Sequence, residues 1–279
     1  MLHIIKIIRP LNILLSVLTL LISAFLLGEL YNIEKLIIPA MVIILFASAG
    51  NIINDIFDFK TDMINRPDRV IPSGLISITQ ARIAVFILFG LGISLSYYLL
   101  PLARIITLFF ILPLLVFYTP FFKRIPLLGN VIVSAILGVV FIYSEASLTG
   151  EVHILWIPAL LAFGLSLIRE LVKDMADVKG DIIQKVNTFP VKYGLQRSVY
   201  IVSLFVFVLC ILSPLPYYYN IYGKYYLIIL VIGVQIPLIF STIQLWKNAN
   251  TTNCIKVSKL LKVVTIVGMI VILISKYSG

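Results

Sequence analysis

The sequence predicts an all-α polytopic membrane protein with nine transmembrane helices, arranged as two pseudo-repeated four-helix units plus one extra helix. Three observations lead to this prediction. The 279 residues are 61% hydrophobic and only 12% charged, with a mean hydropathy of +1.11, far above the range of soluble domains. Apolar runs close to the length of a membrane span recur along the whole chain. Finally, a cluster of three aspartates occurs twice with the same internal spacing.

The spans follow from the length of the apolar runs. A helix rises about 1.5 Å per residue and the hydrocarbon core is about 30 Å thick, so about 20 apolar residues form one span. The nine expected spans are residues 11–29, 36–54, 81–100, 102–119, 130–149, 153–172, 198–215, 224–245 and 259–276. The first run follows Lys6 and Arg9 as a signal peptide would, but it is long for one and no convincing cleavage site follows it, so we expect a span there.

The basic residues predict the orientation of these spans. One side of the membrane would hold only Lys35, Arg104, Lys224 and Lys276, which leaves 22 − 4 = 18 basic residues for the N-terminal segment and the even-numbered loops. Cytoplasmic loops carry the excess of Lys and Arg. We therefore expect a multi-pass protein of the cell membrane with a cytoplasmic N-terminus and an external C-terminus. The net charge of +10 then reflects topology, and we expect no nucleic-acid partner.

The two aspartate clusters lie in the segments NDIFDFKTD (residues 54–62) and KDMADVKGD (residues 173–181). The equivalent pairs, each 119 residues apart, are Asp55 and Asp174, Asp58 and Asp177, and Asp62 and Asp181. Because four spans separate the clusters, the repeats are parallel rather than inverted. We expect a single integral-membrane domain over residues 1–279 with pseudo-repeats at about 11–119 and 130–245, a ninth helix at about 259–276, and the clusters facing each other on the cytoplasmic side.

The spacing of each cluster indicates a metal and a phosphate compound. Positions i, i+3 and i+7 share one face of a helix, and like charges placed there destabilise the helix unless they are neutralised. Mg²⁺ takes a few carboxylates and completes its shell with water and phosphate oxygens. Basic residues near the carboxylates fit a phosphate ligand, although each alone is more often a marker of the cytoplasmic side. These residues are Arg66, Arg69, Lys123, Arg124, Lys173 and Lys179. Arg169 begins a stripe that continues through Lys173 to Asp177 and Asp181.

These segments carry a resemblance to a known family. The first motif of the UbiA superfamily of intramembrane prenyltransferases resembles NDIFDFKTDMINRPDR, and its second motif resembles KDMADVKGD. Its shorter signatures are similar to RPLN at 9–12, YTPFFKR at 118–124 and TFPVKYG at 188–194. The longer string RELVKDMADVKGD is similar to the archaeal digeranylgeranylglyceryl phosphate synthases of that superfamily. The resemblance covers nearly the whole chain.

The resemblance implies a Mg²⁺-bound prenyl diphosphate in a cavity between the two halves. Carried over by position, the metal ligands would be Asn54, Asp58, Asp177 and Asp181, with Asp62 in support. The six basic residues named above would bind the diphosphate. Asp55 and Asp174 remain for positioning or proton removal. The acceptor would meet Arg9, Asn12 and Arg169.

The implied reaction is Mg²⁺-dependent transfer of a geranylgeranyl group from geranylgeranyl diphosphate to the hydroxyl of geranylgeranylglyceryl phosphate, a lipid-like phosphate acceptor. Many relatives with aromatic acceptors have Tyr where Arg169 stands. An aromatic acceptor of the quinone, tocopherol or chlorophyll type is the main alternative. A membrane transporter is a further one, although no span interior carries a paired acid and base. Glu145 lies in the fifth span, where either a functional role or snorkelling to the interface explains a carboxylate.

Overall fold

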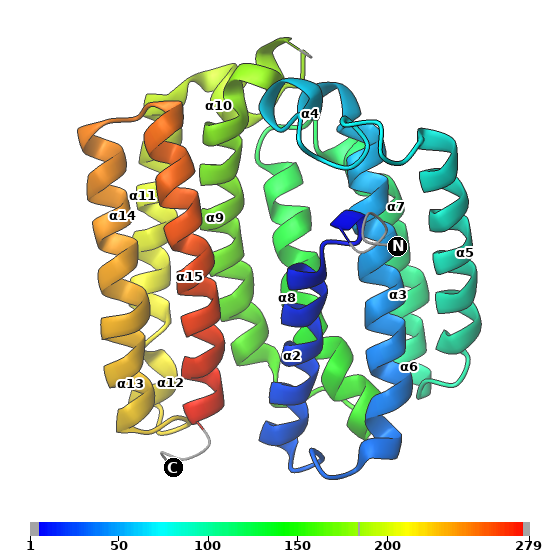
Figure 1. Ribbon diagram of the computed structural model, residues 1–279. Coiled ribbons are helices and arrows are strands. Elements are labelled where there is room, and N and C mark those ends of the chain that lie inside the picture. Colours follow the sequence, from blue (N-terminus) through cyan, green and yellow to red (C-terminus); the bar gives the residue numbers. More distant parts are fainter. Residues whose placement is uncertain (1–5, 184, 276–279) are drawn as a thin grey trace. The chain divides into compact units, whose positions relative to one another are not determined.

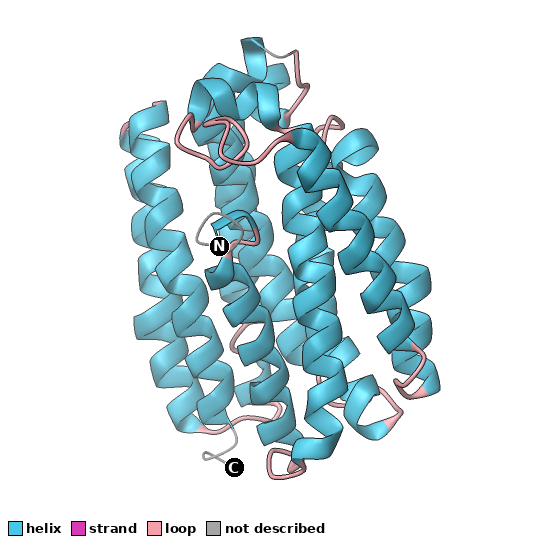
Figure 2. Cartoon of the chain, turned by 45° about the vertical axis from the view of Figure 1, so that its right-hand side comes forward, coloured by secondary structure: helices cyan, strands magenta, loops and turns pink. Residues whose placement is uncertain are grey.

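The computed structural model describes residues 6–183 and 185–275, and all regular structure in this part of the chain is helical (Figures 1 and 2). Eight of its helices are long and apolar enough to cross a membrane. They are Pro10–Leu27 (α2), Ile33–Phe57 (α3), Ile78–Ser96 (α5), Pro101–Phe122, Leu128–Thr149 (α8), Leu195–Tyr218, Lys224–Lys247 and Thr251–Ser275 (α15). The predicted all-helical, multi-pass architecture is confirmed.

The expected span at 153–172 lies within α9, Trp156–Ile183, which is not in this group of eight. Arg169, Glu170 and Lys173 interrupt its apolar stretch, so the second half of α9 is a charged helix end. The count of nine spans therefore stays a prediction. Lys276, which ends the expected ninth span, lies outside the described residues.

Three of the long helices are composite. Pro101–Phe122 consists of α6 (Pro101–Ile105), the π-helical turn η1 (Ile106–Ile111), α7 (Leu112–Phe117) and the π-helical turn η2 (Tyr118–Phe122). Leu195–Tyr218 consists of α11 (Leu195–Leu212) and α12 (Leu215–Tyr218), and Lys224–Lys247 of α13 (Lys224–Leu230), η3 (Val231–Gln235) and α14 (Ile236–Lys247). Pro113 and Pro237 each follow a π turn, and Pro120 lies within one. Proline has no N–H and its ring crowds the carbonyl four residues back, so the helix widens there.

The chain divides into two compact units, Met1–Arg124 with Val139–Leu155, and Ile125–Gly138 with Trp156–Gly279. In the first unit α2, α5, α7 and η2 all pack against α3. The rings of Phe46 and Phe89 meet edge to face, 5.6 Å apart, between α3 and α5, which run side by side in Figure 1. A Cβ at Gly92 would lie 2.4 Å from the Phe46 ring, so glycine permits this close approach.

In the second unit α9 packs against α15, α11 and the short helix α10, Phe189–Tyr193. Its core side chains Leu171, Val172 and Met175 are fully buried. The first half of α8 also approaches α9 closely, because a Cβ at Gly138 would lie 2.7 Å from the carbonyl oxygen of Ala159. Helix α9, whose end carries the second aspartate cluster, is therefore packed against several elements along its length.

Glu145 has a structural role that neither sequence interpretation anticipated. Its carboxylate is 2% exposed and accepts three backbone N–H groups from the loop before α9. One oxygen accepts from His153 at 3.1 Å and Ile154 at 2.8 Å, and the other accepts from Leu155 at 2.9 Å. Glu145 thus fixes the connection that leads into α9.

Candidate functional site

The first aspartate cluster spans an interruption in the helix rather than one continuous helix face. Helix α3 ends at Phe57, and α4 runs over Phe59–Asn65, with Asp58 at the junction. The backbone N–H of Asp58 donates to Asn54 and that of Asp62 donates to Asp58, both at 2.8 Å, so the turn is kept through the junction. Asp55 on α3 and Asp62 on α4 are both buried.

Arg69 joins the two buried carboxylates. Its guanidinium pairs with Asp62 and lies 3.2 Å from an oxygen of Asp55, which also pairs with Arg9. Burial raises the pKa of Asp62, and the charge of Arg69 opposes that rise. Two of the predicted site cations thus neutralise two of the predicted acids.

Hydrophobic packing explains why Arg69 is held in this position. Val70 and Ile71, the next two residues, are buried in a small core with Ile7, Ile52 and Ala81. Arg9 has a left-handed backbone, with φ of 55°, directly before α2. The side chain of Asn51 donates to the carbonyl of Ile8 at 2.8 Å, which ties the N-terminal segment to α3.

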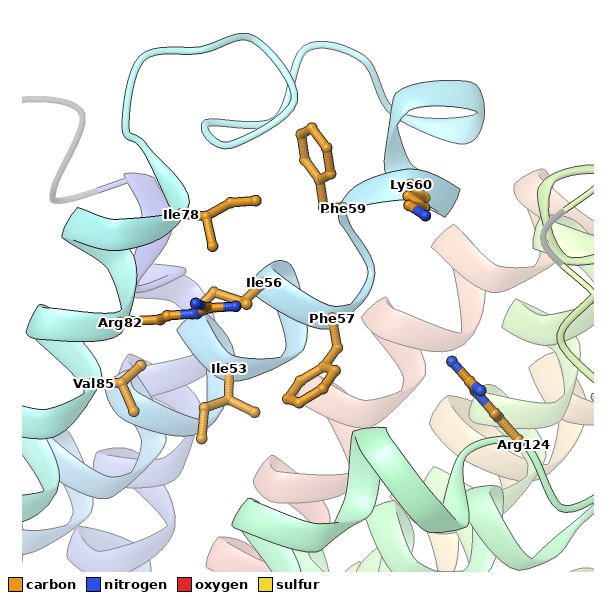
Figure 3. A pocket seen from close by; sticks show the side chains of 9 residues that line it. All are labelled: Ile53, Ile56, Phe57, Phe59, Lys60, Ile78, Arg82, Val85 and Arg124. Carbon is orange, nitrogen blue, oxygen red and sulfur yellow. The ribbon is translucent and has the colours of Figure 1, made fainter.

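The π turn η2 and the residue that follows it, Lys123, supply the partners of Asn54 and Asp58. Thr119 donates its hydroxyl to the side-chain oxygen of Asn54, and Lys123 pairs with Asp58. Lys123 was expected near the carboxylates, and the structure brings it there. Thr119 was missed, although it stands in the YTPFFKR segment beside the noted Lys123. The neighbouring Arg124 lines a different pocket, together with Lys60 and Arg82 (Figure 3).

The second cluster lies on the continuous end of α9, as its spacing predicted. Asp181 is buried and accepts from the Thr188 hydroxyl at 3.4 Å, while Asp177 is partly buried and Lys179 is exposed. Thr188 belongs to the TFPVKYG segment, so that segment supports the cluster directly.

Asp174 has a neutral partner, unlike Asp55. The side chain of Asn130, buried on α8, donates to Asp174 at 2.8 Å. Asp174 lies beyond the expected span 153–172, and burial raises its pKa to about 7, against the opposing effect of the Asn130 hydrogen bond. Sequence reasoning missed Asn130, although a buried asparagine in an apolar run needs a partner.

Glu170 is the third residue that sequence reasoning missed. It is 5% exposed, and its two oxygens accept from Arg169 at 2.6 Å and from Lys173 at 2.8 Å. The predicted stripe Arg169–Lys173 is therefore bridged by a buried carboxylate. The signal was present in the sequence, because Glu170 lies three residues before Lys173, which places the two on one helix face.

Three predicted site residues, Asn12, Arg124 and Lys179, have no side-chain hydrogen bond or ion pair with a carboxylate in the described part of the chain. Asn12 is exposed on the first turn of α2, and Lys179 is exposed on α9. Arg66 ends α4, where its backbone N–H donates to Asp62 at 2.8 Å. The two clusters lie in different units, so their facing each other stays a prediction.

The donor set fits Mg²⁺ by its chemistry. Within residues 6–183 and 185–275, no three His, Cys, Asp or Glu side chains converge on one point. Mg²⁺ does not need such a cage, because it is usually bound by one or two carboxylates, water and phosphate oxygens. Asp58 and Asp62 already face cationic partners, so each carboxylate is placed where positive charge is stabilised.

Comparisons with known proteins identify the family of this chain. The model of the UbiA prenyltransferase family matches residues 15–264. Digeranylgeranylglyceryl phosphate synthase of Methanosphaera stadtmanae is 33% identical over 99% of this chain and 98% of its own length. The protein of the same name from Methanobrevibacter smithii is 34% identical over 98% of each chain.

Solved structures with a similar fold include members of the same family. One, of a digeranylgeranylglyceryl phosphate synthase, has a TM-score of 0.74 at 32% identity and covers 98% of this chain, with 97% of that chain covered. A UbiA homologue from Archaeoglobus fulgidus bound to DMAPP and Mg²⁺ has a TM-score of 0.69 at 16% identity, covering 97% of this chain and 99% of that one, and shares the fold. With the family match over most of its length, this chain belongs to the UbiA prenyltransferase family.

Proposed function

We propose that this protein transfers a geranylgeranyl group from geranylgeranyl diphosphate to the free hydroxyl of geranylgeranylglyceryl phosphate, with Mg²⁺, and so forms the second ether bond of an archaeal-type membrane lipid. The observation that carries this proposal is the similarity, over nearly the full length of both chains, to digeranylgeranylglyceryl phosphate synthases. Structures of a fold relative from Archaeoglobus fulgidus are bound to DMAPP or GPP together with Mg²⁺, which supports a prenyl diphosphate donor and this metal.

The proposed donor site uses the charge pairs of both units. Asn54, Asp58 and Asp62, with Asp177 and Asp181, would hold Mg²⁺. Mg²⁺, when bound, supplies positive charge that stabilises the departing diphosphate. Arg69, Lys123 and Lys173 are the best-placed diphosphate ligands, because each already lies against a carboxylate. Arg66 and Lys179 are weaker candidates for binding the diphosphate.

The acceptor hydroxyl must lose a proton, and Asp174 is the better of the two candidate proton acceptors. Asp55 already pairs with two guanidinium groups, Arg9 and Arg69, which occupy its carboxylate. Asp174 faces an amide and has a pKa of about 7, close to the value at which a general base is most effective near neutral pH. In the transfer step, the C1–O bond of the donor breaks and its electron pair leaves with the diphosphate. The acceptor oxygen then bonds to C1, and the proton of the acceptor hydroxyl passes to Asp174.

We assign the acceptor phosphate to Arg169, with Arg9 in support. Arg can bind phosphate through two parallel charge-assisted hydrogen bonds, which Tyr cannot match. Glu170 acts on this site as a positioning residue, since it holds both Arg169 and Lys173. Asn12 stays a weaker candidate because it is exposed.

The proposed orientation places the N-terminus and both clusters in the cytoplasm and the C-terminus outside. The division of basic residues supports it. The parallel repeat is proposed on the same footing, from the common offset of 119 residues between the clusters.

A transfer assay with a panel of acceptors tests the function. Purified protein with labelled geranylgeranyl diphosphate and Mg²⁺ should prenylate geranylgeranylglyceryl phosphate faster than its dephosphorylated form or any aromatic acid. Faster transfer to an aromatic acid would favour the alternative acceptor class.

The role of Arg169 has its own test. Arg169→Tyr should raise the KM for the phosphate acceptor roughly 10- to 100-fold, as expected for a lost charged hydrogen bond, and raise the KM for the donor much less. Arg197→Gln, an exposed cation on α11 of the same unit with no proposed role in the site, is the matched control and should leave both constants near those of the parent. Equal use of the phosphorylated and dephosphorylated acceptor by the parent would contradict this role.

A further inference from the structure

A pocket lies in the first unit, on the opposite side of α3 from the carboxylates of the candidate site. Its volume is about 460 Å³, and it is lined partly by Ile53, Ile56 and Phe57. At about 100° per residue, these three positions share one side of the helix, whereas Asn54 and Asp55 fall on the other. The pocket is therefore separate from the candidate active site.

The pocket is apolar inside and positively charged at its rim. Ile78 and Val85 of α5 complete its apolar wall, and its only charged residues are Lys60, Arg82 and Arg124. Figure 3 shows Arg82 extending from α5 toward Ile56, and Arg124 approaching from the other side of Phe57. These three cations are exposed, and none of them has an ion pair with another residue described by the structure.

The position of the pocket along the helices matches the depth of lipid head groups. The apolar span of α3 ends at Phe57 and that of α5 begins at Ile78. Ile53 and Val85 thus lie within the spans, while Lys60 lies beyond the end of α3 and Arg82 lies in the first turns of α5. Lys and Arg at this level attract anionic lipid phosphates, and the apolar wall below them suits a hydrocarbon chain.

We propose that this pocket binds an anionic phosphate-bearing lipid of the bilayer, with the phosphate among Lys60, Arg82 and Arg124 and the start of the chain against Ile53 and Val85. Charge complementarity supports this occupant, because the lining contains three cations and no acid. The volume equals that of about 15 water molecules at ~30 Å³ each, so it suits a head group and part of a chain rather than a whole lipid. The proposal does not depend on the acceptor assigned above.

Native mass spectrometry of the detergent-solubilised protein tests this site, with dioleoylphosphatidylglycerol as the probe and without Mg²⁺. Lys60→Gln with Arg82→Gln should weaken binding of the probe by roughly 30-fold, from two interfacial charges. Val85→Phe, which fills the pocket and keeps the charges, should also weaken it at least severalfold. The matched control is Lys247→Gln, an exposed cation at the end of α14, which should bind like the parent.

Each remaining outcome of this experiment is decisive. Circular dichroism and melting curves identify any variant that fails to fold. If Val85→Phe fails to fold, Val85→Ile replaces it, because the smaller added side chain fills only part of the pocket. Equal losses with Lys247→Gln would show general attraction to a basic surface and overturn the proposal. Retained binding in Val85→Phe would do the same. If glycerol 1-phosphate or inorganic phosphate bound as tightly as the lipid, the occupant would be a soluble phosphate and the proposal would be wrong. If uncharged dioleoylglycerol bound as tightly as the lipid, the rim cations would have no role, which would also overturn the proposal.

Discussion

Removal of the Glu145 carboxylate should destabilise the protein without affecting the chemistry. The side chain accepts three backbone N–H groups, two of them from the exposed residues His153 and Ile154 and one from Leu155, which is fully buried. Water can replace the carboxylate as the hydrogen-bond acceptor for the N–H groups of His153 and Ile154. The buried N–H of Leu155 would be left unsatisfied in Glu145→Ala, at a cost of ~1–3 kcal/mol, and the charged bonds lost with it add to that.

We therefore expect Glu145→Ala to lower the free energy of unfolding by about 3 kcal/mol. Glu145→Gln keeps one oxygen for His153 and Ile154 but presents its NH₂ group to Leu155, so it should cost about half as much. The control is Glu151→Ala in the same loop, whose side chain is 71% exposed and pairs only with His153. An exposed pair contributes little, so this change should stay within about 0.5 kcal/mol of the parent.

Equilibrium unfolding in mixed micelles, followed by far-ultraviolet circular dichroism, measures these differences. Prenyl transfer by folded Glu145→Gln should match that of the parent. If Glu145→Ala and Glu151→Ala had equal stabilities, the cap would contribute nothing and the structural role would be wrong. A normally stable but inactive Glu145→Gln would restore the functional interpretation of this intramembrane acid.

Three further predictions concern the site and its orientation. Asp58→Asn and Asp181→Asn should each reduce transfer by orders of magnitude while the protein still folds, and a chelator should abolish transfer by the parent; full activity in chelator would refute metal dependence. Because the pKa of Asp174 is about 7, its carboxylate is ionised above and protonated below that value, so kcat should fall as pH drops through 7, and Asp174→Asn should lower kcat and remove this limb of the profile. Cysteines at Lys185 and Lys224, both exposed, should label only from the cytoplasmic and the external side respectively; labelling from the same side would overturn the topology.

Much of the fold was predictable because the bilayer imposes length and polarity on each span. Each expected apolar run coincides with a helix, and most ends differ by a few residues, but α15 begins at Thr251, well before the expected residue 259. The extension of α9 to Ile183 was not predicted, since hydropathy falls at Arg169 although the helix continues. The interruption of α3 at Asp58 was also missed, because no proline or glycine stands there to signal it.

The candidate site was predictable in its acids and less so in its partners. A repeated spacing identifies Asp58 and Asp181 from the sequence alone, whereas partners from other segments leave no periodic signal. Thr119 reaches Asn54 across 65 residues of chain, and Asn130 reaches Asp174 across 44. Glu170 was overlooked for another reason. It stands between Arg169 and Lys173, which were both assigned to ligand phosphates, and its burial is visible only in the fold.

If Asp58 and Asp62 bind Mg²⁺ as proposed, their pairing with Lys123 and Arg69 would make metal binding an ion-exchange reaction. A divalent ion that takes these oxygens must displace an ammonium or a guanidinium group, and the displaced cation then needs a new anion. A diphosphate provides that anion at the same moment, so metal and donor should each increase the affinity for the other by the same factor. The salt bridges would therefore disfavour metal binding when no donor is present, and the proposed carbocation-forming centre would be assembled only when there is a prenyl group to transfer.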